Sequence, residues 1–319
     1  MVNIGYACIN MQLSYPQKYG NQPKGVERIT TSRSMIRRTF ESKGTDYASE
    51  ITLANVKDLV KYMEWNVEHG FKLYRIGSDI APWKSEYEWT DLKDLEEIKE
   101  TFAIAGKIAT DNGIRLSFHP GPFNVLVSPT QRVVERCVTD LTIHGDIFDF
   151  MNQSRTPYNK INIHLGGAYG DKESAMKRFC KNFELLPESV SSRLTVENDD
   201  KESMYSVKEL YHGVYSNIGV PIVFDFHHHR FCDGGLSEQE ALELAMSTWP
   251  EGIKPCTHVS ESRSKEQLDE SIRPQAHSDY IVNEIPTYGN DFDVMMEAKH
   301  KELAVMKYWN KFNRETLNG

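Results

Sequence analysis

One stretch decides the interpretation of this chain: Ile222-Val223-Phe224-Asp225-Phe226-His227-His228-His229-Arg230. Its apolar first part follows Pro221 and is typical of a strand buried on both faces of a parallel sheet. The stretch then changes to one carboxylate and three imidazoles. Asp225 and His228 are three residues apart, close enough at a strand end to bind one divalent metal ion. A polar loop or an accidental histidine tract is the alternative, and the stretch alone does not distinguish these interpretations from a metal site.

The length and composition allow one large domain. The 319 residues, 39% of them hydrophobic, suffice for two ordinary domains or one α/β barrel. No apolar run reaches the ~18 residues of a membrane span, and the start, MVNIGYACIN, is not typical of a signal peptide. Five scattered cysteines without a CxxC pair are typical of reduced thiols. We therefore expect a cytoplasmic protein with no membrane partner.

The acidic charge bears on possible partners. A net charge of -9 argues mildly against a generic nucleic-acid coat, because phosphate binding usually leaves a basic footprint. A cluster of two or three divalent cations would nevertheless reverse the local charge at a site built from carboxylates. The charge therefore does not exclude a protein that contacts phosphate through metal ions.

Apolar segments alternate with helical patterns along the whole chain. Strands are expected at residues 3–7, 71–76, 114–118, 160–163, 194–196, 222–224, 255–257 and 293–296. Helices are expected at residues 35–40, 52–70 with Thr52 as N-cap, 91–110, 130–141, 145–151, 172–185, 207–217, 237–246 with a capping box at Ser237, 279–284 and 299–309.

This alternation predicts the fold class. Strands separated by helices imply right-handed crossovers and a parallel sheet. Eight strands would close a (β/α)8 TIM barrel, formed as a single domain over residues 1–319. An open doubly wound sheet is the alternative, but no GxGxxG or Walker loop supports it.

Polar side chains follow the apolar strands at their C-terminal ends. They are Asp79, His119, His164, Glu197, Asp225, His258 and Glu297. Each taken singly is more often a satisfied structural group, but seven of them would converge on the face where barrels carry their active sites. Metal ions would relieve the repulsion within such a cluster. Mixed histidine and carboxylate ligands suit Zn²⁺, Mn²⁺ or Fe²⁺, and several ions sharing carboxylates favour phosphoryl chemistry.

A family resemblance covers nearly the whole chain. It is carried, in order, by Ile4-Gly5-Tyr6-Ala7-Cys8-Ile9-Asn10, Tyr74-Arg75-Ile76-Gly77-Ser78-Asp79, Ser117-Phe118-His119-Pro120-Gly121, Ile163-His164, Val196-Glu197-Asn198-Asp199, Phe224-Asp225-Phe226-His227-His228-His229, Ala276-His277-Ser278-Asp279-Tyr280 and Met296-Glu297-Ala298-Lys299-His300-Lys301-Glu302. Together these segments resemble the UV damage endonuclease family, whose barrel is similar to those of endonuclease IV and xylose isomerase.

The resemblance implies an activity and a partner. The family is a group of metal-dependent hydrolases that repair double-stranded DNA. They nick the strand immediately 5′ of cyclobutane pyrimidine dimers or 6-4 photoproducts by metal-activated water, leaving 3′-hydroxyl and 5′-phosphate ends. We expect two or three divalent ions, Mn²⁺ first with Zn²⁺ or Fe²⁺ as alternatives, and a monomer that associates with the nucleoid when it acts on DNA.

The resemblance also implies roles for individual residues. The implied metal ligands are Asp79, where some relatives have His, and His119, His164, Glu197, Asp225, His228, His258, His277 and Glu297. The implied catalytic residues are Glu197, Asp225, His258 and Glu297. His227 and His229 are interpreted as neighbours of the ligands or as loop residues. Tyr6 and Asn10 would face the damaged nucleotides; the alternative is an ordinary buried tyrosine with a capping asparagine.

Two departures from the family pattern affect these expectations. Pro122-Phe123 stands where relatives often have Gln-Tyr, a pair that fills the gap left by a flipped-out lesion. Phe123 can still wedge into the base stack, but Pro122 has no amide to offer to orphaned bases. Cys256 stands where relatives often have Lys, and Lys254 is out of register. Any contribution of that lysine is therefore lost or supplied differently.

Two other functions remain open. A xylose isomerase-like sugar isomerase or epimerase would use the same residue types with two divalent ions, and would suit the acidic charge better. A non-catalytic protein that binds metal or lesions would keep the ligands without a geometry that activates water.

Overall fold

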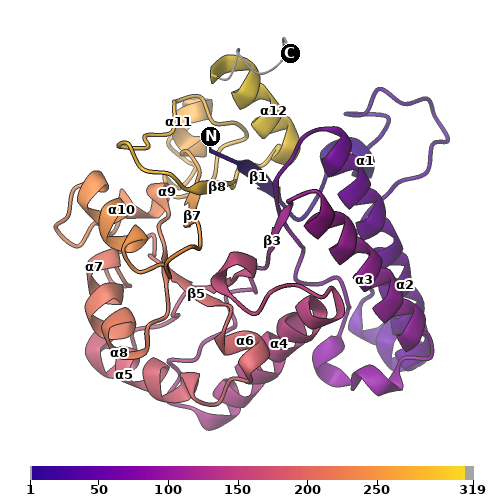
Figure 1. The fold of residues 1–319 in the computed structure, drawn as a ribbon, viewed down its shortest axis with the longest axis horizontal. Helices are drawn as coiled ribbons and strands as arrows, with labels where there is room; N and C mark the ends of the chain where they lie inside the picture. Colours follow the sequence, from indigo (N-terminus) through magenta and orange to yellow (C-terminus); the bar gives the residue numbers. More distant parts are fainter. Residues whose placement is uncertain (1, 313–319) are drawn as a thin grey trace.

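The structure, a computed structural model, describes residues 2–312 of the chain (Figure 1). The strands are β1 (Ile4–Ala7), β2 (Leu73–Arg75), β3 (Arg115–Ser117), β4 (Ile161–Ile163), β5 (Leu194–Glu197), β6 (Ile222–Val223), β7 (Cys256–Val259) and β8 (Asp293–Met296). The helices are α1 (Met11–Ser14), α2 (Arg37–Glu68), α3 (Leu95–Asp111), α4 (Gln131–Phe150), α5 (Lys172–Phe183), α6 (Glu188–Ser191), α7 (Val207–Leu210), α8 (Ser216–Ile218), α9 (Phe226–His229), α10 (Glu238–Met246), α11 (Arg263–Gln267) and α12 (Lys301–Phe312).

The strands form two curled parallel sheets at the centre of the molecule. One sheet has the order β3-β2-β1-β8-β7 and the other the order β4-β5-β6. Single parallel bridges join them, from Phe118 to Ile161 and from Asp225 to His258. Figure 1 shows the strands around the middle and the helices outside them. The expected α/β class with parallel strands is confirmed, whereas the expected barrel is present in part, because regular pairing stops at these two edges.

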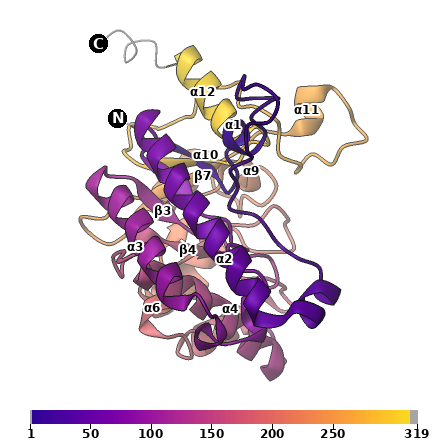
Figure 2. The same cartoon turned by 90° about the vertical axis from the view of Figure 1, so that its right-hand side faces the viewer.

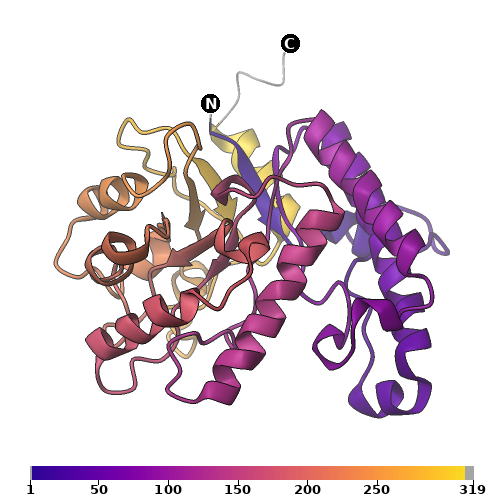
Figure 3. The same cartoon turned by 60° about the horizontal axis from the view of Figure 1, so that its bottom comes forward.

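Burial on both faces explains the apolar strands. All four residues of β1 are buried, as are those of β5, β7 and β8. Gly5 is required in β1 because a Cβ there would lie 2.1 Å from the Leu73 carbonyl oxygen of β2. Outside the sheets, α2 and α3 lie side by side along one flank (Figures 2 and 3). None of the described helices is long and apolar enough to cross a membrane.

Several expected helix boundaries are wrong. Thr52 is not an N-cap but lies inside α2, where its hydroxyl donates to the Ala48 carbonyl oxygen; the chain kinks earlier, at Gly44. The two helices expected at 130–141 and 145–151 are one helix, α4. Gly145 lies inside it and permits close packing, because a Cβ there would lie 2.7 Å from Ser189 Oγ of α6. The range 279–284 is not helical, and the helix of this region is α11. The capping box at Ser237 is confirmed at the start of α10.

Candidate metal centre and active site

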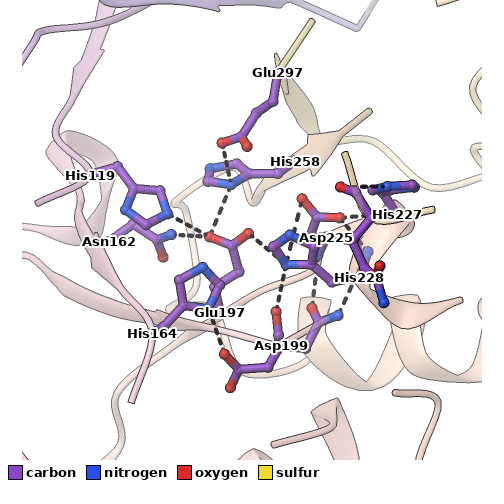
Figure 4. Close-up of polar contacts among 12 residues, drawn as sticks. His119, Asn162, His164, Glu197, Asp199, Asp225, His227, His228, His258 and Glu297 are labelled. Carbon is purple, nitrogen blue, oxygen red and sulfur yellow. Dashed lines mark hydrogen bonds and ion pairs between the residues drawn. The ribbon is translucent and has the colours of Figure 1, made fainter. Parts of the chain in front are cut away.

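The carboxyl ends of the strands bring most of the expected polar residues together. His119, His164 and Asp225 directly follow strands or their extensions, and Glu197 is the last residue of β5. His258 lies within β7 rather than after it, and Glu297 follows β8. Figure 4 shows these side chains pointing toward one another around Glu197. Six residues scattered over 179 positions of sequence therefore share one site.

Glu197 is the centre of this cluster and is fully buried. Its Oε2 atom lies 3.1 Å from His119 Nε2 and 3.0 Å from His258 Nδ1, and it accepts a hydrogen bond from Asn162 Nδ2. Its Oε1 atom lies 3.4 Å from His228 Nδ1. Burial alone would raise its pKa, but the surrounding imidazoles, His258 first, hold that pKa well below its usual range. Glu197 is thus a buried, ionised carboxylate.

Glu297 is the second carboxylate of the cluster, with its side chain 11% exposed, and it faces Glu197 across His258. Its Oε1 atom lies 3.2 Å from His258 Nδ1 and pairs with the Arg75 guanidinium of β2. His277 Nδ1 lies 3.6 Å from the other oxygen. Burial opposes the charge, yet Arg75 holds the pKa of Glu297 well below its usual range. Arg75, which our sequence analysis did not select, therefore fixes this carboxylate in place.

Asp225 divides its two carboxylate oxygens between structure and site. Oδ1 accepts hydrogen bonds from the backbone amides of His227 and His228, so Asp225 is the N-cap of α9. Oδ2 is buried and, within the described residues, accepts no hydrogen bond. Burial, together with the negative charges of Glu197 and Glu297, raises the pKa of Asp225 to about 7. Asp225 is therefore only partly ionised in neutral solution, and a bound cation would displace its proton.

The donor atoms fit divalent metal ions. Three groups of ligand atoms lie within 4.8 Å of one another: His119 with His258 and Glu297, His119 with His164 and Glu197, and Glu197 with Asp225 and His258. Glu197 Oε1 and Asp225 Oδ2 are buried without hydrogen-bond partners among residues 2–312. Such orphaned carboxylate oxygens are costly unless a cation completes them. The cluster can therefore hold metal, and its nitrogen and oxygen donors suit Mn²⁺, Zn²⁺ or Fe²⁺.

Two histidines that interact electrostatically with Glu197, His164 and His258, differ in protonation. Burial disfavours the charged form of His164, but Glu197 and Asp199, the latter 3.1 Å from Nδ1, raise its pKa to about 10. Burial lowers the pKa of His258 to about 3, because the opposing pull of Glu197 is too weak. Without metal, His164 is thus cationic and His258 neutral. Protons and metal ions compete for the same donors.

Lys160 is a site residue that our sequence analysis missed. It is fully buried just before β4, with Nζ 2.8 Å from His258 Nε2, and burial lowers its pKa to about 8. Cys256, which stands where relatives often have Lys, is buried in β7, the strand that carries His258. A lysine therefore does reach His258, but from another strand. Lys254 points elsewhere, as expected, and pairs with Asp291.

Three expected residues lie at the edge of the cluster or outside it. His228 and His277 are near it, but their Nδ1 atoms also lie 2.9 and 3.0 Å from the carbonyl oxygens of Asn198 and Glu297. Neither belongs to the three ligand groups. Asp79 lies apart and lines a cavity of about 80 Å³ with Asp140 and His144. Asp79 thus belongs to none of the three ligand groups.

The residues expected to contact the lesion divide into buried and exposed pairs. Tyr6 and Asn10 are fully buried, and the Tyr6 hydroxyl donates to Asn66 and accepts from Asn10. Asn10 is also the N-cap of α1, so the alternative of a buried tyrosine with a capping asparagine describes them better. Pro122 and Phe123 are exposed, Phe123 to 88%. Only this second pair is free to meet a macromolecule.

His227 and His229 lie on α9 and are buried. The Nε2 atom of His227 lies 3.2 Å from the Gln275 carbonyl oxygen. Burial lowers the pKa of both imidazoles, that of His227 to about 4. Neither takes part in the three ligand groups, so their interpretation as neighbours of the site agrees with their positions.

Fold and cluster together define a parallel α/β protein with a histidine and carboxylate site at the carboxyl edge of its sheets. The model of the family UV-endonuclease UvdE matches residues 2–317. The chain therefore belongs to this family, and the resemblance seen in the sequence is confirmed.

Individual relatives agree with this assignment. A UV-damage endonuclease of Schizosaccharomyces pombe is 32% identical over 97% of this chain, which spans only 50% of that relative. A UV DNA damage endonuclease of Bacillus mycoides is 31% identical, with 82% of each protein covered. The crystal structure of SacUVDE superposes with a TM-score of 0.81 and 27% identity, covering 98% of this chain and 99% of that one.

Proposed function

We propose that this protein is a metal-dependent DNA repair endonuclease that nicks DNA immediately 5′ of UV photoproducts. Cyclobutane pyrimidine dimers and 6-4 photoproducts are its substrates, and the products carry 3′-hydroxyl and 5′-phosphate ends. The observation that carries the proposal is the ionised Glu197 carboxylate, shared by two of the three ligand groups in a chain that belongs to the UV-endonuclease family. The relatives' names, which state UV damage as their target, support the substrate.

The fold would act as one unit. We take the eight strands as one (β/α)8 TIM barrel and residues 1–319 as one domain, acting as a monomer. The two bridges that join the sheets, together with the strand order around them, support this interpretation. A single barrel would place all the candidate ligands on one face, where the βα loops of this fold carry active sites.

Each part of the cluster would have a distinct task. Two or three divalent ions, Mn²⁺ first, would be held by Glu197, Asp225, Glu297 and the adjoining histidines, with His228 and His277 closing the edge. When bound, they supply Lewis acidity for attack by water and charge neutralisation at the phosphate. The chain itself keeps Glu297 in place through Arg75 and orients His258 through Lys160. Asp79 would act from outside this group.

Recognition would fall to the exposed loop after β3. Asn124 holds this loop, since its side chain donates to the Gly121 carbonyl oxygen and to Asp140 Oδ2. The tip of the loop, Pro122-Phe123, is exposed to solvent, while these hydrogen bonds hold the residues next to it in place. Phe123 would wedge into the base stack beside a flipped-out lesion. Tyr6 and Asn10 would support the neighbouring β1–α1 corner from within.

A nicking assay tests the proposal. Purified protein with Mn²⁺ is incubated with a duplex that carries one cyclobutane dimer, and the same duplex without the dimer is the control. We expect a single nick 5′ of the dimer with a 5′-phosphate end. An uncut dimer duplex, combined with turnover of an aldose or ketose, would instead establish the sugar isomerase. Metal and lesion binding without either reaction would establish a non-catalytic protein.

A further inference from the structure

Lys301 holds an unusual position at the first residue of α12. Its backbone is left-handed, with φ of 51°, a conformation that costs energy for a residue with a side chain. Residues kept in such a conformation tend to gather at functional sites, where the surroundings enforce it. Glu302, the next residue, is fully buried and accepts hydrogen bonds from the amides of Met11 and Gln12, which anchors this corner.

The Lys301 amine lies beside the metal centre without an anionic partner of its own. Its electrostatic neighbours are Cys8 at the end of β1, Arg75 and Glu297. Within residues 2–312, no carboxylate lies within 4.0 Å of its Nζ atom and no hydrogen bond engages it. Burial also lowers the pKa of Lys301, so its charge is partly desolvated, and the nearby charge of Glu297 is already paired with Arg75.

The neighbouring cations are arranged differently. Lys299, two residues earlier, is exposed and likewise has no ion pair among the described residues. Lys307, farther along α12, lies over the ring of Tyr280, 4.0 Å from its centroid. The first turn of α12 and its approach therefore present two unmatched positive charges beside the site, in a chain whose net charge is -9. An anion from outside the protein would complete them.

We propose that Lys301, with Lys299 beside it, binds a backbone phosphate of the DNA strand that enters the site. This inference rests on the proposed nuclease function and adds a phosphate-binding subsite to it. The strand order β3-β2-β1-β8 places the Phe123 loop at one end of this part of the rim and Lys301 at the other. Phe123 would thus enter the DNA strand beside the lesion, and Lys301 would bind one of its phosphates on the far side of the metal centre.

Salt dependence of DNA binding tests the subsite. Binding of an undamaged duplex, which the enzyme does not cut, is measured by fluorescence anisotropy between low and moderate salt in Mn²⁺. Each lost phosphate contact should reduce the slope of log affinity against log salt by about 0.9. We expect that reduction for Lys301→Gln and an unchanged slope for Lys301→Arg. Lys307→Gln removes the same charge from the same helix, and we expect it to match the wild type.

A chemically altered duplex locates the contact. In a dimer-containing duplex, each phosphate near the lesion is replaced in turn by a neutral methylphosphonate. One position should remove the difference in affinity between wild type and Lys301→Gln, because the amine then has nothing to bind. Elemental analysis should find equal metal in all variants. Lys301→Gly, which suits the left-handed backbone, should show the same loss if Lys301→Gln folds poorly.

The outcomes separate the two proposals. An unchanged salt slope in both Lys301→Gln and Lys301→Gly, with nicking of dimer DNA intact in the wild type, would overturn the subsite alone. A wild-type protein that neither nicks nor binds dimer DNA would overturn the nuclease and the subsite together. A changed salt slope would also overturn the subsite if no single methylphosphonate removed the affinity difference between wild type and Lys301→Gln. The lysine would then act only through the overall electrostatic potential of the protein.

Discussion

The candidate metal centre and the loop after β3 are neighbours at the same rim, but they are built in opposite ways. Glu197 and His258 are fully buried, and each contacts several charged or polar groups. Phe123 is 88% exposed and stands on a loop that Asn124 holds through its side chain. Reaction chemistry requires donors held in one geometry away from water. The lesion recognition that we propose for Phe123 would require a side chain free to enter another molecule, so the two proposed tasks would have separate supports.

The largest effect should come from the centre of the buried cluster. Glu197→Gln removes the shared negative charge, so we expect nicking to fall by at least about 10³-fold, the scale of a lost electrostatic contact in an active site. A single-turnover nicking assay with a circular dichroism check measures this. Glu173→Gln on the exposed face of α5 is the matched control. Full activity in Glu197→Gln would refute its place at the centre.

Acid should weaken metal binding strongly. In the metal-free protein, Asp225 titrates at about 7 and His164 at about 10, so both bind protons at pH 6. Ligands must lose these protons to bind a cation, and affinity therefore rises with pH, by about tenfold per pH unit for each proton released. Calorimetric titration with Mn²⁺ at pH 6 and 8 should show about 10³-fold tighter binding at pH 8, about tenfold from Asp225 and about 10²-fold from His164. An affinity that falls with pH would contradict these assignments.

A moderate effect should come from the support of His258. Lys160→Met keeps the shape of the buried chain but removes the contact with His258 Nε2. Losing such an outer partner typically costs about 10–100-fold in metal affinity or activity. Metal titration and thermal unfolding measure the two effects separately. Lys93→Met, which breaks only an exposed pair with Glu50, should leave both unchanged. Unaltered metal affinity in Lys160→Met would show that the contact merely fills space.

The smallest effect should come from the exposed loop. Stacking of an aromatic side chain on a base contributes about 1–3 kcal/mol, so we expect Phe123→Ala to reduce the preference for damaged over intact DNA by about tenfold. Thermal stability should stay within about 0.5 kcal/mol of the wild type, since the side chain is exposed. Competition binding with dimer and intact duplexes measures the preference. Leu268→Ala, also exposed, is the control, and an equal effect there would refute a specific wedge.

The sequence predicts best where the cause is local. Residues 293–296 were expected as a strand and are β8, because an apolar run between polar ends specifies it. The Ser237 capping box also follows from four consecutive residues. Polar residues after apolar runs led to the site because parallel strands end at the same edge. The fold class and most residues of the cluster around Glu197 can therefore be predicted from local sequence patterns.

The failures share a different cause. Lys160 reaches His258 across 98 positions, and nothing near either residue indicates the contact. Glycine is unfavourable inside a helix, yet Gly145 lies within α4, where its lack of a side chain lets α6 pack closely. Only the tertiary structure reveals this role. The resemblance implied that Tyr6 faces the damaged nucleotides, with a buried tyrosine as the alternative, and its hydroxyl in fact donates to Asn66 in the interior. In each case the deciding partner is distant in sequence.

Asp225 caps α9 with one carboxylate oxygen and leaves the other to the site, and this division affects how a cation would bind. Because Oδ1 is bound to the amides that open α9, the side chain can take few rotamers, and Oδ2 keeps its direction toward Glu197. A cation that arrives therefore meets a donor that has already lost its rotational freedom. The entropy of ordering that ligand is spent when the chain folds. A metal ion that binds here would then bind and dissociate reversibly, without refolding of the chain.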